Sequence, residues 1–124
     1  MINLILAAAL ALTAPAPGLA GDWVVDLTPG TGPAYLKGMT LVLTEDGKVA
    51  GQFYDSEIEA GRWQTSKDRT CASFRTSDGV GPYHSVACRE GDKVTGQTWA
   101  EHRNFVFIWS AKPATASDRK APWW

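Results

Sequence analysis

The sequence lacks an excess of charge of either sign, and this lack restricts its partners. Twelve Lys and Arg side chains stand against 13 Asp and Glu in 124 residues, which gives a formal net charge of −1. A chain without a basic surface is not expected to bind nucleic acid or an anionic membrane. Hydrophobic residues at 44% and charged residues at 20% are typical of one small globular domain.

Motifs for catalysis and metal binding are also missing. Only two histidines occur, His84 and His102, and neither belongs to a His-x-His, His-Glu-x-x-His or mixed Cys/His pattern. The sequence has no Gly-x-Ser-x-Gly elbow for a nucleophile and no glycine loop of the phosphate-binding type. We therefore expect a protein without enzymatic activity, without a metal and without a cofactor.

One long apolar run is present, from Ile2 to Leu12, and it indicates export. It has the length of a signal-peptide core and is too short to cross a bilayer. Small residues in Gly18-Leu19-Ala20 suit signal peptidase, whereas cleavage after Ala16 would leave Pro17 beside the cut. We predict a signal peptide over residues 1–20, cleaved after Ala20, and a soluble periplasmic or secreted product. A buried N-terminal helix is the alternative.

The remaining sequence predicts an all-β fold. Short runs of alternating apolar and polar residues recur between Gly, Asp, Asn and Ser, and no window has a helical apolar period. Eight strands are expected, at Asp22–Leu27, Leu36–Thr44, Lys48–Tyr54, Ile58–Thr65, Thr70–Thr76, Pro82–Arg89, Lys93–Trp99 and Phe105–Ala111. The short connections favour antiparallel hairpins between consecutive strands.

Turn chemistry sets the register of two hairpins. A three-residue turn ending at Gly47 aligns the apolar residues of its two strands, pairing Leu43 with Val49. A symmetric turn over residues 77–81 places Cys71 opposite Cys88. Opposed cysteines in an exported protein predict a structural disulfide, and no Cys-x-x-Cys pattern supports a redox role.

Eight short strands in a meander have exposed edges unless the sheet closes on itself. We predict an eight-stranded antiparallel β-barrel over residues 21–112, with a β-sandwich as the alternative. Its interior would be filled by side chains or hold one small ligand. Residues 113–124 are rich in Pro, Ala and Ser and predict a flexible tail, whose terminal Trp123-Trp124 would fray, cover the barrel or contact a partner.

Several short motifs resemble the calycin group of β-barrels, which includes lipocalins and avidin-like proteins. They are the opening Gly21-Asp22-Trp23, then Gly51-Gln52-Phe53, Thr95-Gly96-Gln97 and Trp109. The resemblance implies that Trp23 plugs one end of a ligand-binding barrel. The terminal acidic strand of avidin-like proteins and the C-terminal helix of lipocalins have no counterpart, so biotin binding is not implied.

Two groups of residues are candidates for a ligand site. Trp23, Phe53, Tyr83 and Trp109 are expected to point inward, either lining an apolar pocket or filling the core, and core packing is favoured. A two-residue Gly91-Asp92 turn would align Arg75, His84 and Trp99 in one cross-strand row. That row is either an anion-recognition patch or, as we favour, an outer row in which Arg75 covers Trp99.

Other polar segments give weaker indications. Asp55, Glu57 and Glu59 alternate along the chain, which would suit calcium or acid/base chemistry, but a solvated loop is favoured. Residues 101–104 predict a polar turn at the barrel mouth. We expect a small apolar or amphiphilic molecule as the ligand. The alternative is that residues 28–35 insert into a secreted enzyme, such as a protease or lysozyme, as an inhibitor.

Overall fold

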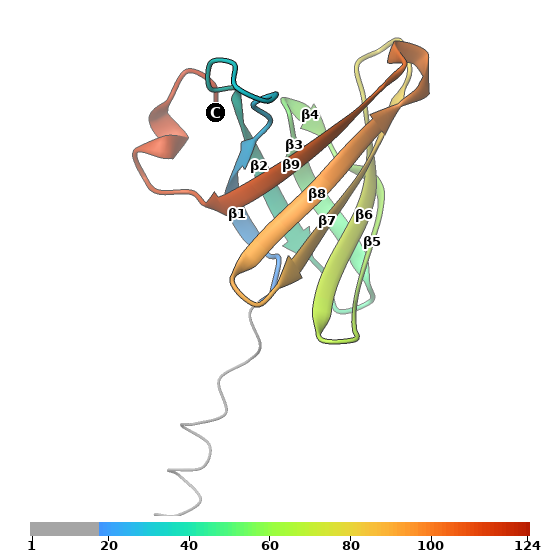
Figure 1. Ribbon diagram of the computed structural model, residues 1–124. Coiled ribbons are helices and arrows are strands. Elements are labelled where there is room, and N and C mark those ends of the chain that lie inside the picture. The colour runs from blue at the N-terminus through green and yellow to red at the C-terminus, as the bar shows by residue number, and fades with distance from the viewer. Residues whose placement is uncertain (1–17) are drawn as a thin grey trace, which may run out of the picture.

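The computed structural model describes residues 18–124, and its regular secondary structure consists of β-strands and two short helices (Figure 1). The predicted signal sequence lies outside the described residues except for Gly18, Leu19 and Ala20. The strands are β1 (Gly21–Asp26), β2 (Leu36–Leu43), β3 (Lys48–Phe53), β4 (Ser56–Glu57), β5 (Glu59–Ser66), β6 (Arg69–Ser77), β7 (Pro82–Glu90), β8 (Lys93–Ala100) and β9 (Phe105–Pro113). Two short 3-10 helices follow later strands, η1 (Glu101–Arg103) and η2 (Asp118–Lys120). No helix within residues 18–124 is both long enough and apolar enough to span a membrane.

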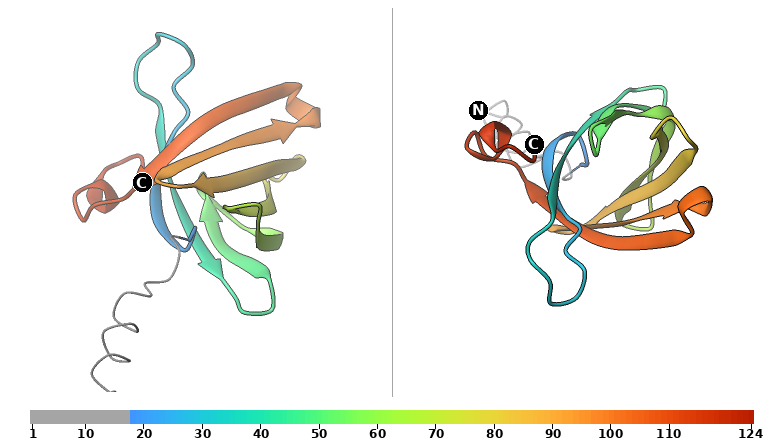
Figure 2. Two further views of the ribbon diagram at one scale, coloured as in Figure 1. Left: turned by 60° about the horizontal axis from the view of Figure 1, so that its bottom comes forward. Right: turned by 90° about the horizontal axis from the view of Figure 1, so that it is seen from above.

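Eight of these strands close into an antiparallel barrel, as the sequence predicted. Each strand pairs with the next along the chain, and β9 pairs with β1, which joins the last strand to the first. The two-residue strand β4 was not predicted; it adds only a short pairing to β3. Looking along the barrel from above, Figure 2 shows one continuous wall, so the alternative of two stacked sheets is wrong.

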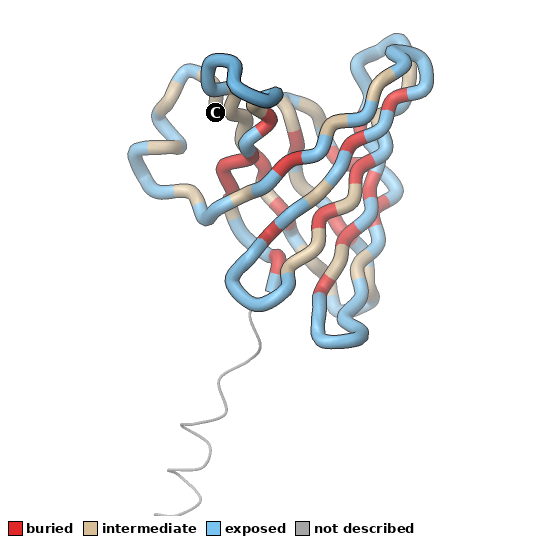
Figure 3. The backbone as a smooth tube through the Cα atoms, viewed as in Figure 1, coloured by how far each residue is buried: buried red, intermediate tan, exposed pale blue. Residues whose placement is uncertain are grey.

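The predicted hairpin registers are confirmed. Leu43 pairs with Val49 across the turn that ends at Gly47, which has the positive φ of 85° that this position requires. Across the hairpins β6–β7 and β7–β8, His84 pairs with Arg75 and with Trp99. Buried and exposed residues alternate along most strands in Figure 3, because successive side chains point into and out of the barrel.

Cys71 and Cys88 form the predicted disulfide between β6 and β7. We expect the Cys71→Ser/Cys88→Ser variant to lose about 3 kcal/mol of unfolding free energy, because an 18-residue loop of the unfolded chain is no longer closed. Urea denaturation with and without a reducing agent measures this loss. Reduction should leave the double variant unchanged, and an equal urea midpoint for the oxidised wild type and the variant would contradict the expectation.

The lower and middle parts of the barrel are filled by side chains. Trp109 and Phe53 lie 5.5 Å apart between ring centroids, and both are buried. The Trp109 indole nitrogen donates a hydrogen bond of 3.0 Å to the Thr98 hydroxyl, which also bonds Ser85 at 2.8 Å. Since the buried polar atoms are paired and the rings are in contact, this part of the interior is core, the outcome that the sequence favoured.

The lower end of the barrel is closed around Trp23. Its indole nitrogen donates to the Leu19 carbonyl at 2.8 Å, and the Arg89 guanidinium lies 5.7 Å from the ring centroid. Arg89 also donates to the Gly18 carbonyl at 3.1 Å, and Leu19 is completely buried. Residues 18–20, expected to leave with the signal peptide, thus form part of the plug at this end.

The C-terminal segment lies against the barrel, in contrast to the flexible tail that was expected. Residue 113 still belongs to β9, and the chain then turns back along the outside (Figure 1). Arg119 forms an ion pair of 2.7 Å with Asp22, and the Trp124 ring packs closely over Gly38. Glycine at position 38 leaves the space that the Trp124 ring occupies, a contact that spacing along the chain does not indicate.

Candidate functional site

The structure separates the seven predicted ligand-site residues into three locations. Trp23, Phe53 and Trp109 are buried inside the barrel. Tyr83 lies at the upper mouth, where its ring is half-buried and its hydroxyl reaches a polar cluster. The other three, Arg75, His84 and Trp99, form the predicted cross-strand row on the outer surface.

A cavity of about 380 Å³ opens at the upper mouth, the end seen in the right view of Figure 2. Aromatic side chains dominate its wall, and the buried Phe53 contributes to its floor. The lining residues are Tyr35, Phe53, Tyr54, Asp55, Ser56, Thr76, Asp78, Tyr83, Phe105 and Phe107. Sequence reasoning identified two of the aromatic members, Phe53 and Tyr83.

The other four rings of the cavity wall come from the end of the 28–35 loop, from the end of β3 and from β9. Tyr35 ends the 28–35 loop, where its backbone nitrogen bonds the Thr28 hydroxyl at 2.9 Å and its carbonyl accepts from Leu27 at 2.8 Å. Its ring meets those of Tyr54 at 5.9 Å and Phe107 at 6.5 Å, both edge to face. Phe105 packs on Phe107 at 4.7 Å. These contacts hold the rings before any ligand is present.

A polar cluster centred on Asp78 borders the cavity. One carboxylate oxygen accepts hydrogen bonds from the backbone N–H groups of Val80 and Gly81, at 2.8 and 2.9 Å. The other accepts from the Tyr83 hydroxyl at 2.8 Å and from Arg103 at 2.9 and 3.1 Å, and it lies 3.1 Å from His102 Nε2. Residues 101–104, expected as a polar turn, form η1 and supply two of these partners.

These hydrogen bonds shift two pKa values in opposite directions. Bonds from the Gly81 backbone, His102, the Val80 backbone and Tyr83 hold the pKa of Asp78 far below its usual range. Burial raises the pKa of the Tyr83 hydroxyl, and its bond to Asp78 adds to the rise. The hydrogen bonds to Asp78 connect residues 78–83 with η1 and so brace the mouth.

The three alternating carboxylates do not converge. Asp55 pairs with Lys37 at 2.8 Å, whereas Glu59 lies 3.8 Å from Arg75 on the outer wall. Within residues 18–124, no group of three or more His, Cys, Asp and Glu side chains is arranged to hold a metal. All three side chains are exposed, as the favoured interpretation expected, but Glu57 and Glu59 lie in β4 and β5 and not in a loop.

In the outer row of Arg75, His84 and Trp99, one contact differs from the one that the sequence predicted. His84 stacks on Trp99, with 5.8 Å between ring centroids and 29° between planes, in the position expected for Arg75. Arg75 instead points toward Glu59. The 28–35 loop, expected to be exposed, projects from the upper end (left view of Figure 2), and its role as an inhibitory segment stays a prediction.

Sequence reasoning did not identify four aromatic residues of the mouth, and only Tyr54 stands beside residues that indicate a turn. The four are Tyr35, Tyr54, Phe105 and Phe107. Phe105 and Phe107 alternate with the exposed Val106 and Ile108, so all four positions are apolar and the inward face cannot be identified from hydrophobicity. Tyr54 has a positive φ of 54°, which redirects its side chain at the end of β3. A tyrosine directly before Asp55-Ser56 was the one hint of a turn there.

Comparison with known proteins adds no relative from which a function could be transferred. No protein-family model, no curated protein and no solved structure matches the chain. The function is therefore inferred from the chemistry of the barrel mouth.

Proposed function

We propose that this protein is a non-catalytic binding protein that holds a small neutral amphiphilic molecule in the aromatic mouth of its barrel. The observation that carries the proposal is the preformed cavity of about 380 Å³ lined by six aromatic rings. Pockets for small molecules are usually concave, mostly apolar and of about 300–1,000 Å³. Because the barrel is filled below Phe53, the ligand would enter only its upper part.

The polar groups of the mouth favour a neutral ligand over an ion. Asp55 and Asp78 line the cavity, but Lys37 neutralises the first, and Arg103 the second. Neither carboxylate thus offers a free negative charge to a cation, and their presence disfavours an anion. Hydroxyl groups of Ser56 and other lining side chains are suited to hydrogen bonding with a hydroxyl or amide on the ligand.

The remaining parts of the proposal concern export and family. The apolar run at the N-terminus and the disulfide support a protein of the periplasm or the extracellular space. The closed barrel and the plug by Trp23 support a calycin-like protein. The low pKa of Asp78 supports the absence of acid/base catalysis at the mouth.

Titration with N-phenyl-1-naphthylamine, a neutral apolar fluorophore, tests the mouth site. We expect its fluorescence to rise on binding, and the Phe105→Ala variant to bind it about tenfold more weakly, since a stacking ring is lost. Val106→Ala is the matched control, because the neighbouring Val106 side chain faces solvent on the same strand. Equal affinity of both variants, or no binding of the probe to the wild type, would overturn the proposal.

A further inference from the structure

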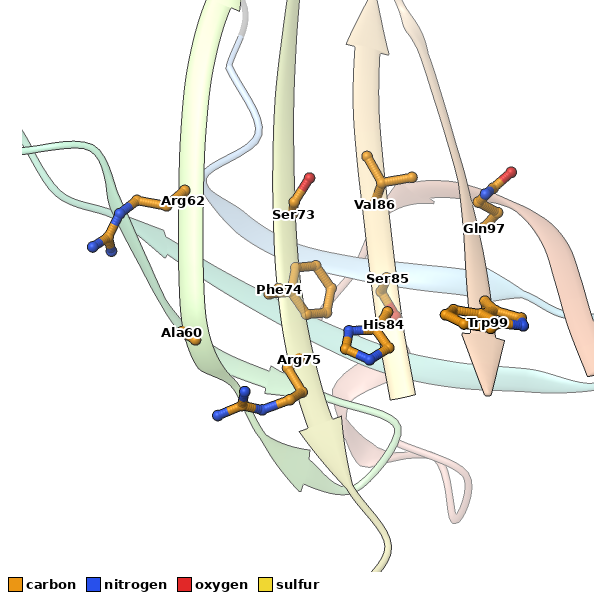
Figure 4. Close-up of a pocket in the computed structure, with 10 residues that line it drawn as sticks. All are labelled: Ala60, Arg62, Ser73, Phe74, Arg75, His84, Ser85, Val86, Gln97 and Trp99. Atoms are coloured by element: carbon orange, nitrogen blue, oxygen red, sulfur yellow. The ribbon is translucent and has the colours of Figure 1, made fainter. Parts of the chain in front are cut away.

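A second cavity, of about 450 Å³, lies on the outer wall of the barrel, away from the mouth site (Figure 4). Two adjacent cross-strand rows build it. One row runs from Arg75 through His84 to Trp99, and the other runs through Ser73, Val86 and Gln97. Arg62 on β5 extends the second row, because it pairs with Ser73. We call this cavity the outer groove.

Two guanidinium groups stand at one side of the outer groove. Among the described residues, the Arg62 side chain has one hydrogen bond, to the Gly61 carbonyl at 3.1 Å, and no ion pair. Arg75 has a loose ion pair with Glu59 at 3.8 Å and no hydrogen bond from its side chain. Each guanidinium carries five N–H donors, so most of these donors are available to an anion.

A β-bulge places Arg62 beside the groove. The register of β5 against β6 shifts between Glu59 and Arg62, and Ala60 in the bulge has a positive φ of 52°. A bulge bends its strand and redirects the side chains that follow. Here it adds a second cation to the groove, in the row next to the one that Arg75 begins, and Ala60 itself lines the cavity.

Flat apolar surface occupies the other side. The His84 and Trp99 rings are stacked, and 47% of Trp99 is exposed although it is a large aromatic residue in the middle of a sheet. Val106 and Ile108 on β9 continue the two rows and are 53% and 71% exposed. Contiguous apolar surface beside one unpaired and one loosely paired arginine is typical of a binding surface.

We propose that the outer groove binds a planar aromatic anion, with its carboxylate or sulfonate between Arg62 and Arg75 and its rings against Trp99. The charge of the lining favours this ligand, because it includes two arginines and no Asp or Glu. Arg75 and Trp99 are two strands apart, which corresponds to about 10 Å between their backbones and is comparable to the length of a two-ring aromatic acid. The site is independent of the mouth, whose lining includes two carboxylates instead.

Calorimetric titration with 2-naphthoate tests the proposal, with 2-naphthamide as the uncharged ligand of the same shape. We expect the amide to bind at least tenfold more weakly than the acid, and added salt to weaken only the acid. The Arg62→Gln/Arg75→Gln variant should lose at least tenfold in affinity for 2-naphthoate. The Arg69→Gln/Lys93→Gln variant removes the same charge from β6 and β8 outside the groove and should bind normally.

The outcomes separate this site from the mouth. Phe105→Ala should bind 2-naphthoate as the wild type does while it loses affinity for the neutral fluorophore. Equal binding of acid and amide, full affinity in the Arg62→Gln/Arg75→Gln variant, weakened 2-naphthoate binding in Phe105→Ala, or no binding of 2-naphthoate at millimolar concentration would each overturn the proposal. Both substituted arginines are on the surface, and a circular dichroism melt of the variant checks that it folds.

Discussion

Gly51→Ala is expected to lower the free energy of unfolding by about 4 kcal/mol, the sum of backbone strain and overpacking. Gly51 lies in β3 with a φ of +125°, a conformation that residues with a side chain rarely adopt. A Cβ atom at this position would overlap the Thr40 carbonyl on the neighbouring strand β2. Because the Thr40 carbonyl belongs to the backbone, the clash can be relieved only if strands β2 and β3 move apart.

Gly21→Ala is the matched control for this substitution. Gly21 has nearly the same φ, +124°, but a Cβ atom there would meet no atom within 4 Å. The two variants therefore share the backbone strain and differ in the clash. Urea denaturation should give Gly21→Ala a midpoint between those of the wild type and Gly51→Ala. Equal midpoints for the two variants would show that the contact with Thr40 adds no cost.

A chain that starts at Gly21 is expected to be about 4 kcal/mol less stable than one that starts at Gly18. Removing Leu19 uncovers the core beneath it, at a cost of about 2.5 kcal/mol for a fully buried leucine. The Trp23 indole also loses its acceptor, which adds about 1.5 kcal/mol. For a domain of this size the thermal midpoint should fall by roughly 15 °C or more.

Comparing thermal melts of the two chains measures this loss of stability. The Leu19→Ser variant of the longer chain distinguishes the contribution of the Leu19 side chain from that of its carbonyl. That variant should lose the burial of Leu19 and keep the hydrogen bond to Trp23. If both chains melt together, residues 18–20 are not part of the folded unit. If the expected difference is found, the predicted cleavage after Ala20 would leave this end of the barrel without its plug, and mass spectrometry of the exported protein tests where the cut falls.

The sequence predicted strands well because their signals are local. Alternation with a period of two residues, combined with Gly47, the turn over residues 77–81 and the Gly91-Asp92 turn, specified which residues face each other across three hairpins. The pairing of Cys71 with Cys88 and the alignment of His84 with Trp99 followed from the same counting. Strand ends were displaced by a residue or two, and the two-residue strand β4 was too short to leave a pattern.

The mouth could not be predicted to the same degree because its residues meet only after the barrel closes. Asp78 contacts His102 and Arg103 from 24 and 25 residues away, and Tyr35 meets Phe107, which lies 72 residues further along the chain. No local pattern links such positions. The stack of His84 on Trp99, where Arg75 was expected, depended on Glu59, which a bulge in β5 brings opposite Arg75.

By itself the sequence determined the all-β class, the order and register of the strands, and the disulfide, because hydrophobic alternation and turn residues act between near neighbours. Only the tertiary structure decided which part of the interior is full and which is open. Trp109 and Phe53 fill the barrel, whereas the rings of Tyr35, Tyr54 and Phe105 leave space at its mouth. That difference depends on how side chains from distant strands share one enclosed volume, which close packing settles only when all strands are in place.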